Sequence, residues 1–412
     1  MYRIIFFILT LLIVSVSSDA QNNSPKLTNQ DPAEVETVDF ISYDHFLRHD
    51  WKLLINYSEK ALNNNIDFYY LRLRLGIAYY ELHQYRKALY HFEKAYQMDN
   101  RDELLKEYLY YCYLFTDQYS QALKISKKFS DVTLKKTNLE YPSGVFLVNV
   151  EYGNKLASDT SLYKTLKYFQ AGIGFKLGRG VTAYSAFTNI TQQMYYGTLS
   201  QQQLYASINI PLNNSWAITP AFHFINYAYN NQLTSPPPKP GDPKSSLSSL
   251  DGTSYVGSIS ISKNWKDFLF NGGLSYSTLN KAKQYQQQFG VSWFPLHNNK
   301  LTINPSLILF SNDSGTSLKP IISCSAKYFL HSKFSVAANY SSIETKNFNE
   351  LNGYSVNNSD DITHQRITAI LDLNCYKNIN IFGVYVHESK TELLSIKNYT
   401  FNTGIIGIKL TF

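Results

Sequence analysis

The strongest constraint on the fold is a two-residue alternation of apolar and polar side chains that runs from residue 141 to the C-terminus. It is clear at the end of the chain, where Ile406, Ile408, Leu410 and Phe412 alternate with small or polar residues. Successive strand side chains point to opposite faces, so the pattern predicts strands with one apolar and one polar face. Such strands, apolar towards lipid and polar towards water, are typical of a transmembrane β-barrel over 141–412.

Turn-forming residues divide this region into about fourteen strands, each near the roughly ten residues that a tilted membrane span needs. The predicted strands cover 143–152, 165–177, 181–193, 200–211, 215–229, 253–264, 267–278, 284–295, 300–311, 318–330, 333–346, 362–375, 378–390 and 399–412. Counts of about twelve or sixteen are the alternatives. Pro220 and Pro305 fall inside predicted strands, and we expect bulges or shifted strand boundaries there because proline has no N–H to donate.

Short turns alternate with long connections along the region, as in outer-membrane barrels with periplasmic turns and external loops. The proline-rich connection over 230–252 is the best candidate for a loop that folds into the lumen. A soluble β-sandwich is the competing architecture, since alternation alone does not exclude it. The N-terminus and the last strand together favour a closed barrel.

The N-terminus has the order of a secretory signal peptide. Arg3 precedes an apolar run from Ile4 to Ile13, and Ser18 and Ala20 form a small-residue cleavage site. We predict a signal peptide over 1–20, followed by a linker over 21–34; an uncleaved anchor fits less well because the apolar run is short for a span. The last strand resembles that of Gram-negative outer-membrane barrels. This resemblance implies that Ile408, Leu410 and Phe412 form the signal for the barrel-insertion machinery.

The stretch from 35 to 136 carries helical rather than strand periodicity. Its clearest part has Leu75, Gly76 and Tyr79, then Ala88, Phe92 and Ala95, which is the small-and-large pattern of a 34-residue helix-turn-helix repeat. The segment resembles the tetratricopeptide-repeat family, with about three repeats and degenerate outer copies, as expected of capping units.

In that family, a defined set of first-helix positions lines the concave face. The resemblance implies that Tyr43, Tyr70, Tyr80 and Tyr111 lie there and offer rigid aromatic surface to a peptide or sugar. The alternative is that so small an array only packs against the barrel rim. The fold class is therefore α+β and multidomain: a tetratricopeptide-like solenoid followed by an outer-membrane barrel.

Strand parity predicts a polar cluster of His223, His364, Arg366 and His387 in the lumen. No nucleophile motif accompanies these side chains, so we predict no catalytic site and no enzyme. The three cysteines are widely spaced and have no metal-ligand pattern, and no cofactor motif is present. The net charge of +7 is spread along the chain, which argues against nucleic-acid binding.

The architecture is similar to exporters of exopolysaccharides and to repeat-plus-barrel proteins of Bacteroidota-like bacteria. Our first hypothesis is an outer-membrane pore for transport or secretion, with a periplasmic repeat domain that recruits cargo or a partner protein. The alternative is a non-conducting scaffold or assembly factor that uses the repeats for protein-protein interaction. The expected partners are outer-membrane lipid, the barrel-assembly machinery, and a periplasmic protein or polysaccharide.

Overall fold

The computed structural model describes residues 32–137, 143–161, 163–178, 180–194, 197–212, 215–231, 252–312, 319–359, 361–376, 378–392 and 396–412. The predicted signal peptide, most of the linker and residues 232–251 of the proline-rich connection lie outside these described residues. No helix among the described residues is long and apolar enough to cross a membrane.

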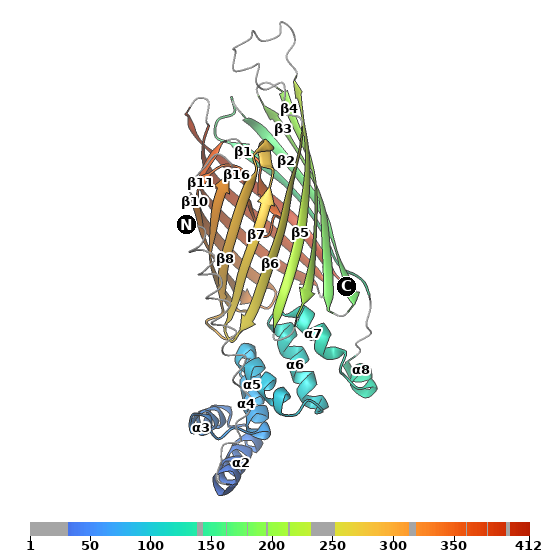
Figure 1. Cartoon of the computed structure of the whole chain (residues 1–412), viewed down its shortest axis with the longest axis vertical. Helices are drawn as coiled ribbons and strands as arrows, with labels where there is room; N and C mark the ends of the chain where they lie inside the picture. Colours follow the sequence, from blue (N-terminus) through green and yellow to red (C-terminus); the bar gives the residue numbers. More distant parts are fainter. Residues whose placement is uncertain are drawn as a thin grey trace.

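Seven helices precede the barrel within the described residues. They are α2 (Pro32–Leu47), α3 (Trp51–Asn63), α4 (Tyr69–Glu81), α5 (Tyr85–Met98), α6 (Glu103–Phe115), α7 (Tyr119–Ser126) and α8 (Asp131–Thr137). From α2 to α7, each helix packs against the next one along the chain. We call α2 to α8 the helical unit; it lies below one end of the barrel (Figure 1).

The turns inside the helix pairs repeat one geometry. His49, His83 and Asp117, each 34 positions after the last, have φ values of 58°, 58° and 58°. At the middle turn, the His83 N–H donates to the Tyr80 carbonyl (2.9 Å) and the Gln84 N–H to the Tyr79 carbonyl (2.9 Å). Both neighbouring turns repeat this pair of bonds, which is the Schellman ending of a helix. The helical unit thus repeats a helix-turn-helix geometry with the period that the sequence predicts.

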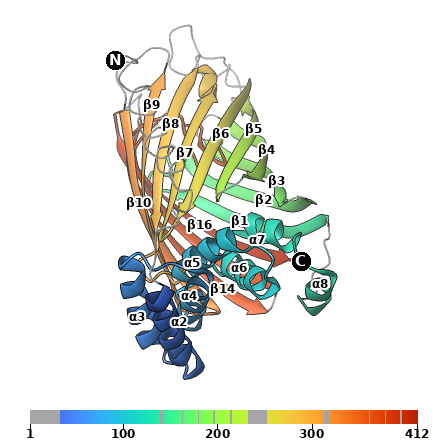
Figure 2. The ribbon, with the colours of Figure 1, turned by 60° about the horizontal axis from the view of Figure 1, so that its bottom comes forward.

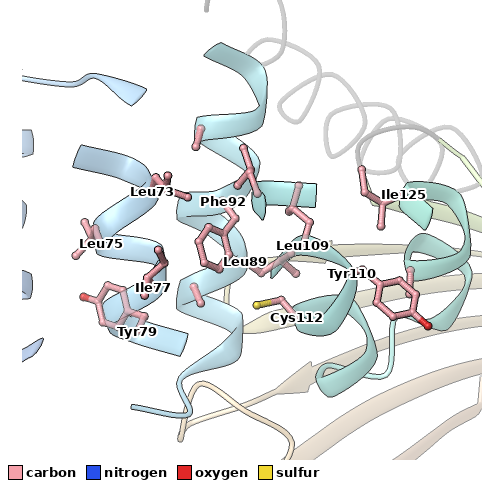
Figure 3. Packing of buried hydrophobic residues seen from close by; sticks show 14 of the residues in the cluster. Leu73, Leu75, Ile77, Tyr79, Leu89, Phe92, Leu109, Tyr110, Cys112 and Ile125 are labelled. Atoms are coloured by element: carbon pink, nitrogen blue, oxygen red, sulfur yellow. The ribbon is translucent and has the colours of Figure 1, made fainter. Parts of the chain in front are cut away.

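The core of the helical unit depends on a close helix-helix approach. A Cβ built on Gly76 would stand 2.4 Å from the Phe92 ring, so only glycine lets α4 and α5 meet at this distance. Phe92 is fully buried, and Leu75, Leu105 and Leu109 pack in the same cluster (Figure 3).

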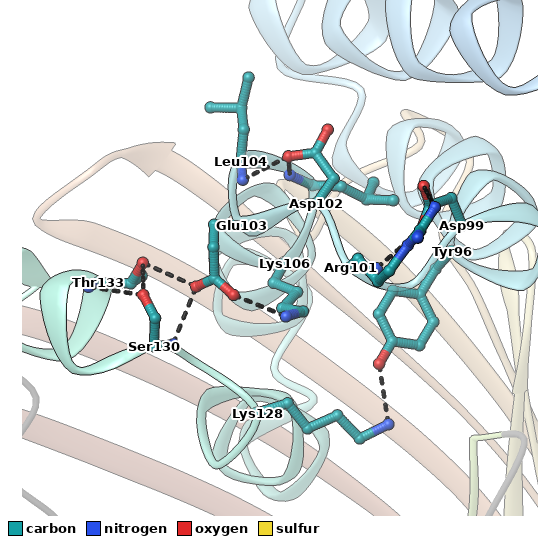
Figure 4. A network of polar contacts seen from close by, with 11 residues as sticks. Tyr96, Asp99, Arg101, Asp102, Glu103, Leu104, Lys106, Lys128, Ser130 and Thr133 are labelled. Carbon is teal, nitrogen blue, oxygen red and sulfur yellow. Dashed lines mark hydrogen bonds and ion pairs between the residues drawn. The ribbon is translucent and has the colours of Figure 1, made fainter.

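The last helix is attached by polar contacts (Figure 4). The Glu103 carboxylate accepts hydrogen bonds from the Ser130 N–H (3.0 Å) and the Thr133 hydroxyl (2.8 Å), and it pairs with Lys106 at 2.7 Å. Asp102 caps α6 by accepting from the Leu104 N–H at 2.8 Å. These bonds join α6 to α8 ahead of the first strand.

The remaining chain forms a closed antiparallel barrel of fourteen strands, which confirms the predicted count. They are β1 (Gly144–Ala157), β2 (Tyr163–Gly178), β3 (Val181–Met194), β4 (Gly197–Pro211), β5 (Trp216–Asn231), β6 (Gly252–Trp265), β7 (Phe268–Ser277), β8 (Gln284–Trp293), β9 (Leu301–Asn312), β10 (Lys319–His331), β11 (Phe334–Thr345), β14 (Ile362–Tyr376), β15 (Ile379–Thr391) and β16 (Asn398–Thr411). The first and last strands close the ring, with Val150 opposite Ile408.

The outer face of the barrel is apolar and the inner face is polar. On β16, Ile406 is 61% exposed and Phe412 68% exposed, and both lie on the outer face with Ile408 and Leu410. On β14, the exposed Ile367 and Leu371 share that face, whereas Arg366 and Thr368 line the interior. This inversion of the usual core is the arrangement that a lipid exterior and a watery interior favour.

The expected bulges at Pro220 and Pro305 are absent. Pairing of β4 with β5 keeps one register on both sides of Pro220, and pairing of β8 with β9 does so around Pro305. Each proline interrupts the ladder to one neighbour and stays fully paired with the other, at Ile259 and Cys324. Loss of an N–H donor therefore removes ladder bonds without inserting a residue.

The helical unit docks on the short turns at one end of the barrel (Figure 2). The Arg86 N–H donates to the His297 carbonyl at 2.9 Å, and its guanidinium lies 3.2 Å from the centroid of the Phe294 ring. Asn298 donates to the His83 carbonyl (3.1 Å), and Ser215 donates to the Glu93 carboxylate (3.2 Å). The tight turns and the helical unit therefore share one end of the molecule.

Candidate functional site

The barrel encloses a cavity of about 1110 Å³, which is the candidate functional site. About half of its lining residues are Ser, Thr, Asn, Gln or Gly, contributed by many strands. They include Gln192, Gln201, Gln203, Ser260, Asn271, Gly273, Gln288, Gly290, Asn304, Ser306, Ser323, Ser325, Asn339, Thr368 and Thr403. Tyr163, Tyr168, Tyr227 and Phe401 add aromatic surface. Such a wall hydrogen-bonds water readily and leaves space beside it.

A short hairpin folds into this lumen from the connection between β11 and β14. Its strands are β12 (Phe348–Glu350) and β13 (Ser355–Asn357), paired outside the main barrel sheet. Leu351, Asn352 and Gly353 make its tip with φ values of 52°, 56° and 79°. Three successive left-handed residues form a tight reversal that L side chains rarely adopt. We call residues 347–359 the lumen hairpin.

The tip of the lumen hairpin is hydrogen-bonded to the wall formed by β5 and β6. His223 Nδ1 donates to the Gly353 carbonyl at 2.6 Å, since a carbonyl can only accept. The Ser258 hydroxyl donates to the Asn352 carbonyl (2.7 Å), and the Asn352 amide donates to Ser260 (2.8 Å). His223 is 2% exposed, so this polar contact is buried within the protein.

The base of the hairpin is held by side chains from other strands. Gln286 on β8 donates to the Asn349 carbonyl (2.8 Å) and accepts from the Asn349 N–H (2.9 Å). Phe348 packs with Ile308, Ile321 and Ile343 in a small apolar cluster. The hairpin is thus fixed by pairing, packing and hydrogen bonds at once.

An ion network joins the hairpin to the opposite side of the lumen. Arg366 on β14 pairs with Glu350 of the hairpin and, at 2.8 Å, with Glu388 on β15. Lys155 on β1 pairs with the same Glu388. Glu388 and Lys390 are almost fully buried, at 4% and 2% exposure. Charges desolvated to this degree are stable only as hydrogen-bonded partners, so the network is a strong anchor for Glu350.

The structure brings together two of the four predicted lumen residues. His223 and Arg366 both contact the lumen hairpin. His387 lies on the outer face of β15, where it accompanies the exposed Tyr385 and is bonded to Asn402 at 2.8 Å. His364 lies at a bulge between Thr363 and Gln365, with its ring bonded to Glu344 and Thr391.

The prediction was therefore wrong for His364 and His387. A bulge reverses side-chain parity in the first case. In the second, residues 381–386 are apolar or aromatic on both faces apart from one glycine, so alternation does not say which face is inward. The pairing of β15 with β16 decides which face of β15 is inward. Phe382 lies opposite Gly407 and faces inward, because the missing Cβ of Gly407 leaves room for the ring.

The predicted inward-folding connection over 230–252 falls largely on residues outside the described part of the chain. Among the described residues, the segment 347–359 enters the lumen. Asn352 and Gly353 indicate a tight hairpin turn, because asparagine and glycine tolerate positive φ, but they do not indicate on which side of the barrel wall it lies.

The four predicted tyrosines of the helical unit form two groups. Tyr43 and Tyr70 are exposed, and the Arg74 guanidinium lies 4.9 Å and 5.7 Å from their ring centroids. Tyr80 and Tyr111 are partly buried, and each lies 6.2 Å from the ring of Phe115. Tyr80 and Tyr111 thus contribute to packing, whereas Tyr43 and Tyr70 present surface.

The turn between α6 and α7 reaches the mouth of the barrel. Asn299 donates to the Asp117 carboxylate at 2.6 Å, and the Arg86 guanidinium donates to Asn299 at 3.3 Å. Burial raises the pKa of Asp117, and the charges of Lys327 on β10, Arg86 and Lys409 on β16 oppose that rise. This turn of the helical unit therefore lies against the β8–β9 connection, at the tight-turn end of the barrel.

Among the described residues, no group of three or more His, Cys, Asp or Glu side chains could hold a metal ion. The three cysteines are free: Cys112 is buried in the helical unit, and Cys324 and Cys375 lie exposed on barrel strands.

No protein-family model matches the sequence, and no curated protein matches it. Among solved structures, it is similar to the outer membrane protein Omp33 of Acinetobacter baumannii (9% identity, TM-score 0.38, 66% of this chain and 100% of that one). A TodX mutant, a monoaromatic hydrocarbon channel, gives 8% identity and a TM-score of 0.43 over 66% and 91% of the two chains. A FadL homologue of Pseudomonas aeruginosa gives 7% and 0.40 over 66% and 90%. Similarity at this level carries no inference about family or cargo.

Proposed function

We propose that this protein is an outer-membrane channel for transport or secretion, narrowed by its lumen hairpin and carrying its helical unit in the periplasm. The apolar outer face supports a lipid environment, and Phe412 at the end of β16 fits a signal for the barrel-insertion machinery. The shared end of the tight turns and the helical unit supports the periplasmic placement.

The observation that carries the proposal is the cavity of about 1110 Å³ that remains beside the hairpin. Small barrels without a transport role are filled by their own side chains, whereas larger ones leave an aqueous path. Here about half of the lining residues are Ser, Thr, Asn, Gln or Gly, and among the described residues the lumen hairpin occupies part of the interior. The hairpin is thus a constriction whose removal should widen the path.

The test is single-channel conductance of the mature chain in planar bilayers. We would compare the wild type with a variant in which residues 347–359 are replaced by a short Gly-Ser link. The expected result is a small or intermittent conductance in the wild type and a several-fold larger, steady one in the variant. A matched control shortens residues 232–251 and retains the whole lumen hairpin.

Silence of both the wild type and the hairpin variant, with the barrel folded, would overturn the channel proposal. It would favour the alternative, a non-conducting scaffold that captures a partner with its repeats. A folded barrel is recognised by its heat-dependent mobility in gels, so lack of folding and lack of conduction are distinguishable.

We further propose that the helical unit is a tetratricopeptide-repeat array that recruits a periplasmic protein or polysaccharide to the barrel mouth. The recurring turns at His49, His83 and Asp117 support the repeat assignment. The exposed pair Tyr43 and Tyr70, with Arg74 between them, is the surface best suited to contact a partner. We assign no catalytic role, since the buried histidine His223 serves to hold the hairpin.

A further inference from the structure

A cluster of aromatic and basic side chains lies where α5 meets the β6–β7 turn. The ammonium of Lys266 stands 5.2 Å from the centroid of the Tyr90 ring and 5.1 Å from that of Trp265. The ammonium of Lys87 stands 5.2 Å from the centroid of the Tyr79 ring. We call these five residues the α5 rim patch; it joins the helical unit to the barrel's outer surface.

Buried rings join the two halves of the patch beneath its surface, with Tyr79 2% exposed and His91 7% exposed. His91 stacks on Tyr79 with ring centroids 5.4 Å apart, and its edge contacts Tyr90 at 5.1 Å. Burial, with the charges of Arg72, Lys87 and Lys266, lowers the pKa of His91 to about 3. Each lysine thus stands over a ring that contacts His91.

The barrel side of the patch has the composition of a membrane boundary. Trp265 is 51% exposed and Trp293 43% exposed on the outer face, at the tight-turn ends of β6 and β8. Phe268 pairs with both and lies between them. Tryptophan prefers the depth of lipid head groups, so this row marks where the membrane surface meets the helical unit.

The nearby acids have other partners, and Asp267, next to Lys266, accepts from His297 Nδ1 at 2.8 Å. Glu59 accepts the hydroxyl proton of Tyr79, and Asp67 pairs with Arg72 at 2.7 Å. Glu93 accepts from the Tyr113 hydroxyl (2.9 Å) and the Ser215 hydroxyl (3.2 Å). Because these acids are engaged elsewhere, they offset the positive charges of Lys87 and Lys266 less than their number suggests.

We propose that the α5 rim patch binds the head group of an anionic phospholipid of the adjacent leaflet. Lys87 and Lys266 would contact the phosphate, and Trp265 would lie beside the glycerol and upper acyl chain. The inference rests on the proposed function only in requiring the barrel to be inserted in a membrane. It gives the helical unit a lipid contact that holds it against the barrel.

The chain's own tryptophans provide the test. It has four, of which Trp216, Trp265 and Trp293 lie at this end of the barrel and Trp51 lies in α3. We would replace Trp51 by Phe and reconstitute the full mature chain in phosphatidylcholine vesicles. Fluorescence quenching would then be compared between brominated phosphatidylglycerol and brominated phosphatidylcholine at equal mole fraction.

The expected result is stronger quenching by the anionic lipid, corresponding to at least about a twofold local enrichment. The variant Lys87→Gln/Lys266→Gln should lose this preference and keep the quenching by phosphatidylcholine. The control variant Lys283→Gln/Lys333→Gln removes the same charge from exposed positions elsewhere and should keep the preference.

Equal quenching by both lipids would overturn this inference and leave the channel proposal standing. A preference that persists in the Lys87→Gln/Lys266→Gln variant would overturn the assignment to the patch. Absence of quenching by either lipid would show that the barrel is not inserted, which overturns the channel proposal as well. Gel mobility verifies that every variant folds.

Discussion

The helical unit and the barrel are built from opposite arrangements of apolar side chains. In the helical unit, Phe92 and Leu105 are fully buried and most charged side chains are at least partly exposed. In the barrel, Ile259 and Leu371 are 51% and 54% exposed, while Gln203 and Glu388 are buried inside. In water, the hydrophobic effect stabilises the helical unit by burying its apolar side chains. The barrel, whose apolar side chains face outward, needs lipid around it. Substitutions of similar chemistry should therefore have opposite consequences in the two regions.

The largest effect is expected from Phe92→Ala in the helical unit. Truncation of a fully buried ring that fills the space left by Gly76 should reduce the free energy of unfolding by about 3–5 kcal/mol. The measurement is a urea titration of the full chain in vesicles, followed by the helical signal in circular dichroism. Phe40→Ala, at a side chain 73% exposed, should change it by less than about 0.5 kcal/mol. Equal effects would contradict the assigned core.

A new charge on the lipid side of the barrel should have the next largest effect. Ile259→Lys should destabilise the inserted barrel by about 2–4 kcal/mol, because Ile259 lies on the outer face of β6. Ser262→Lys, on the inner face of the same strand, should leave folding nearly unchanged. The folded fraction in a urea series, measured by gel mobility, decides between them. The reverse order would mean that the two faces are misassigned.

Acid should weaken the helical unit through His91. Its Nδ1 accepts a hydrogen bond from Arg72 (3.0 Å), which requires a neutral ring, and its pKa is lowered to about 3. The unfolded chain binds this proton below about pH 6.5 and the folded chain does not, so stability falls as pH drops from about 6.5 towards 3. The expected slope approaches about 1.4 kcal/mol per pH unit. In the variant His91→Gln, the urea midpoint of unfolding should depend much less on pH over this range.

Glu93 provides the opposite dependence. Burial raises its pKa although Tyr113 and Ser215 donate to it, so its ionised form is less stable in the folded than in the unfolded chain. The stability that protonated Glu93 contributes is fully present below its pKa in the unfolded chain. It is lost as the pH rises through the higher pKa of Glu93 in the folded chain. Glu93→Gln should therefore raise the urea midpoint of the helical unit at neutral pH and change it little at pH 4. A lower midpoint at neutral pH would contradict this assignment.

The smallest effect is expected at Pro305. Pro305→Ser restores an N–H on the side where the ladder to β8 is interrupted, without any change of register. One recovered hydrogen bond should stabilise the barrel by roughly 0.5–1.5 kcal/mol. The folded fraction in urea measures it, and the same change at Pro211, which ends β4, serves as the comparison. A loss of stability would indicate that the proline ring contributes packing that outweighs the bond.

Much of the fold could be predicted from local patterns. Alternation along 362–375 and 399–412 predicted β14 and β16 to within a few residues, because a two-residue period is a direct consequence of strand geometry. The spacing of Gly76, Ala88 and Phe92 likewise predicted a close-packed helix pair. The left-handed residues His49, His83 and Asp117 went unnoticed, since none is the glycine or asparagine usual at that position.

The candidate site was less predictable. His223 and Arg366 were placed in the lumen correctly, yet their common partner, the lumen hairpin, was not foreseen. Residues 347–359 are mostly polar and show only short stretches of strand-like alternation. No local sequence pattern therefore distinguishes a loop that folds into the lumen from one that extends outward. The distinction comes from wall residues more than a hundred positions away, such as Gln170 and His223.

By itself, the sequence determined the strands, the helix pairs and the apolar and polar faces of most strands, because each depends on neighbours a few residues apart. The tertiary structure decided what depends on closure of the ring. It set the inward face of β15, displaced His364 at a bulge and seated Glu350 on Arg366. It also placed Asp117 at the mouth and Lys266 beside Tyr90. These contacts join segments far apart in the chain, and a local period carries no information about them.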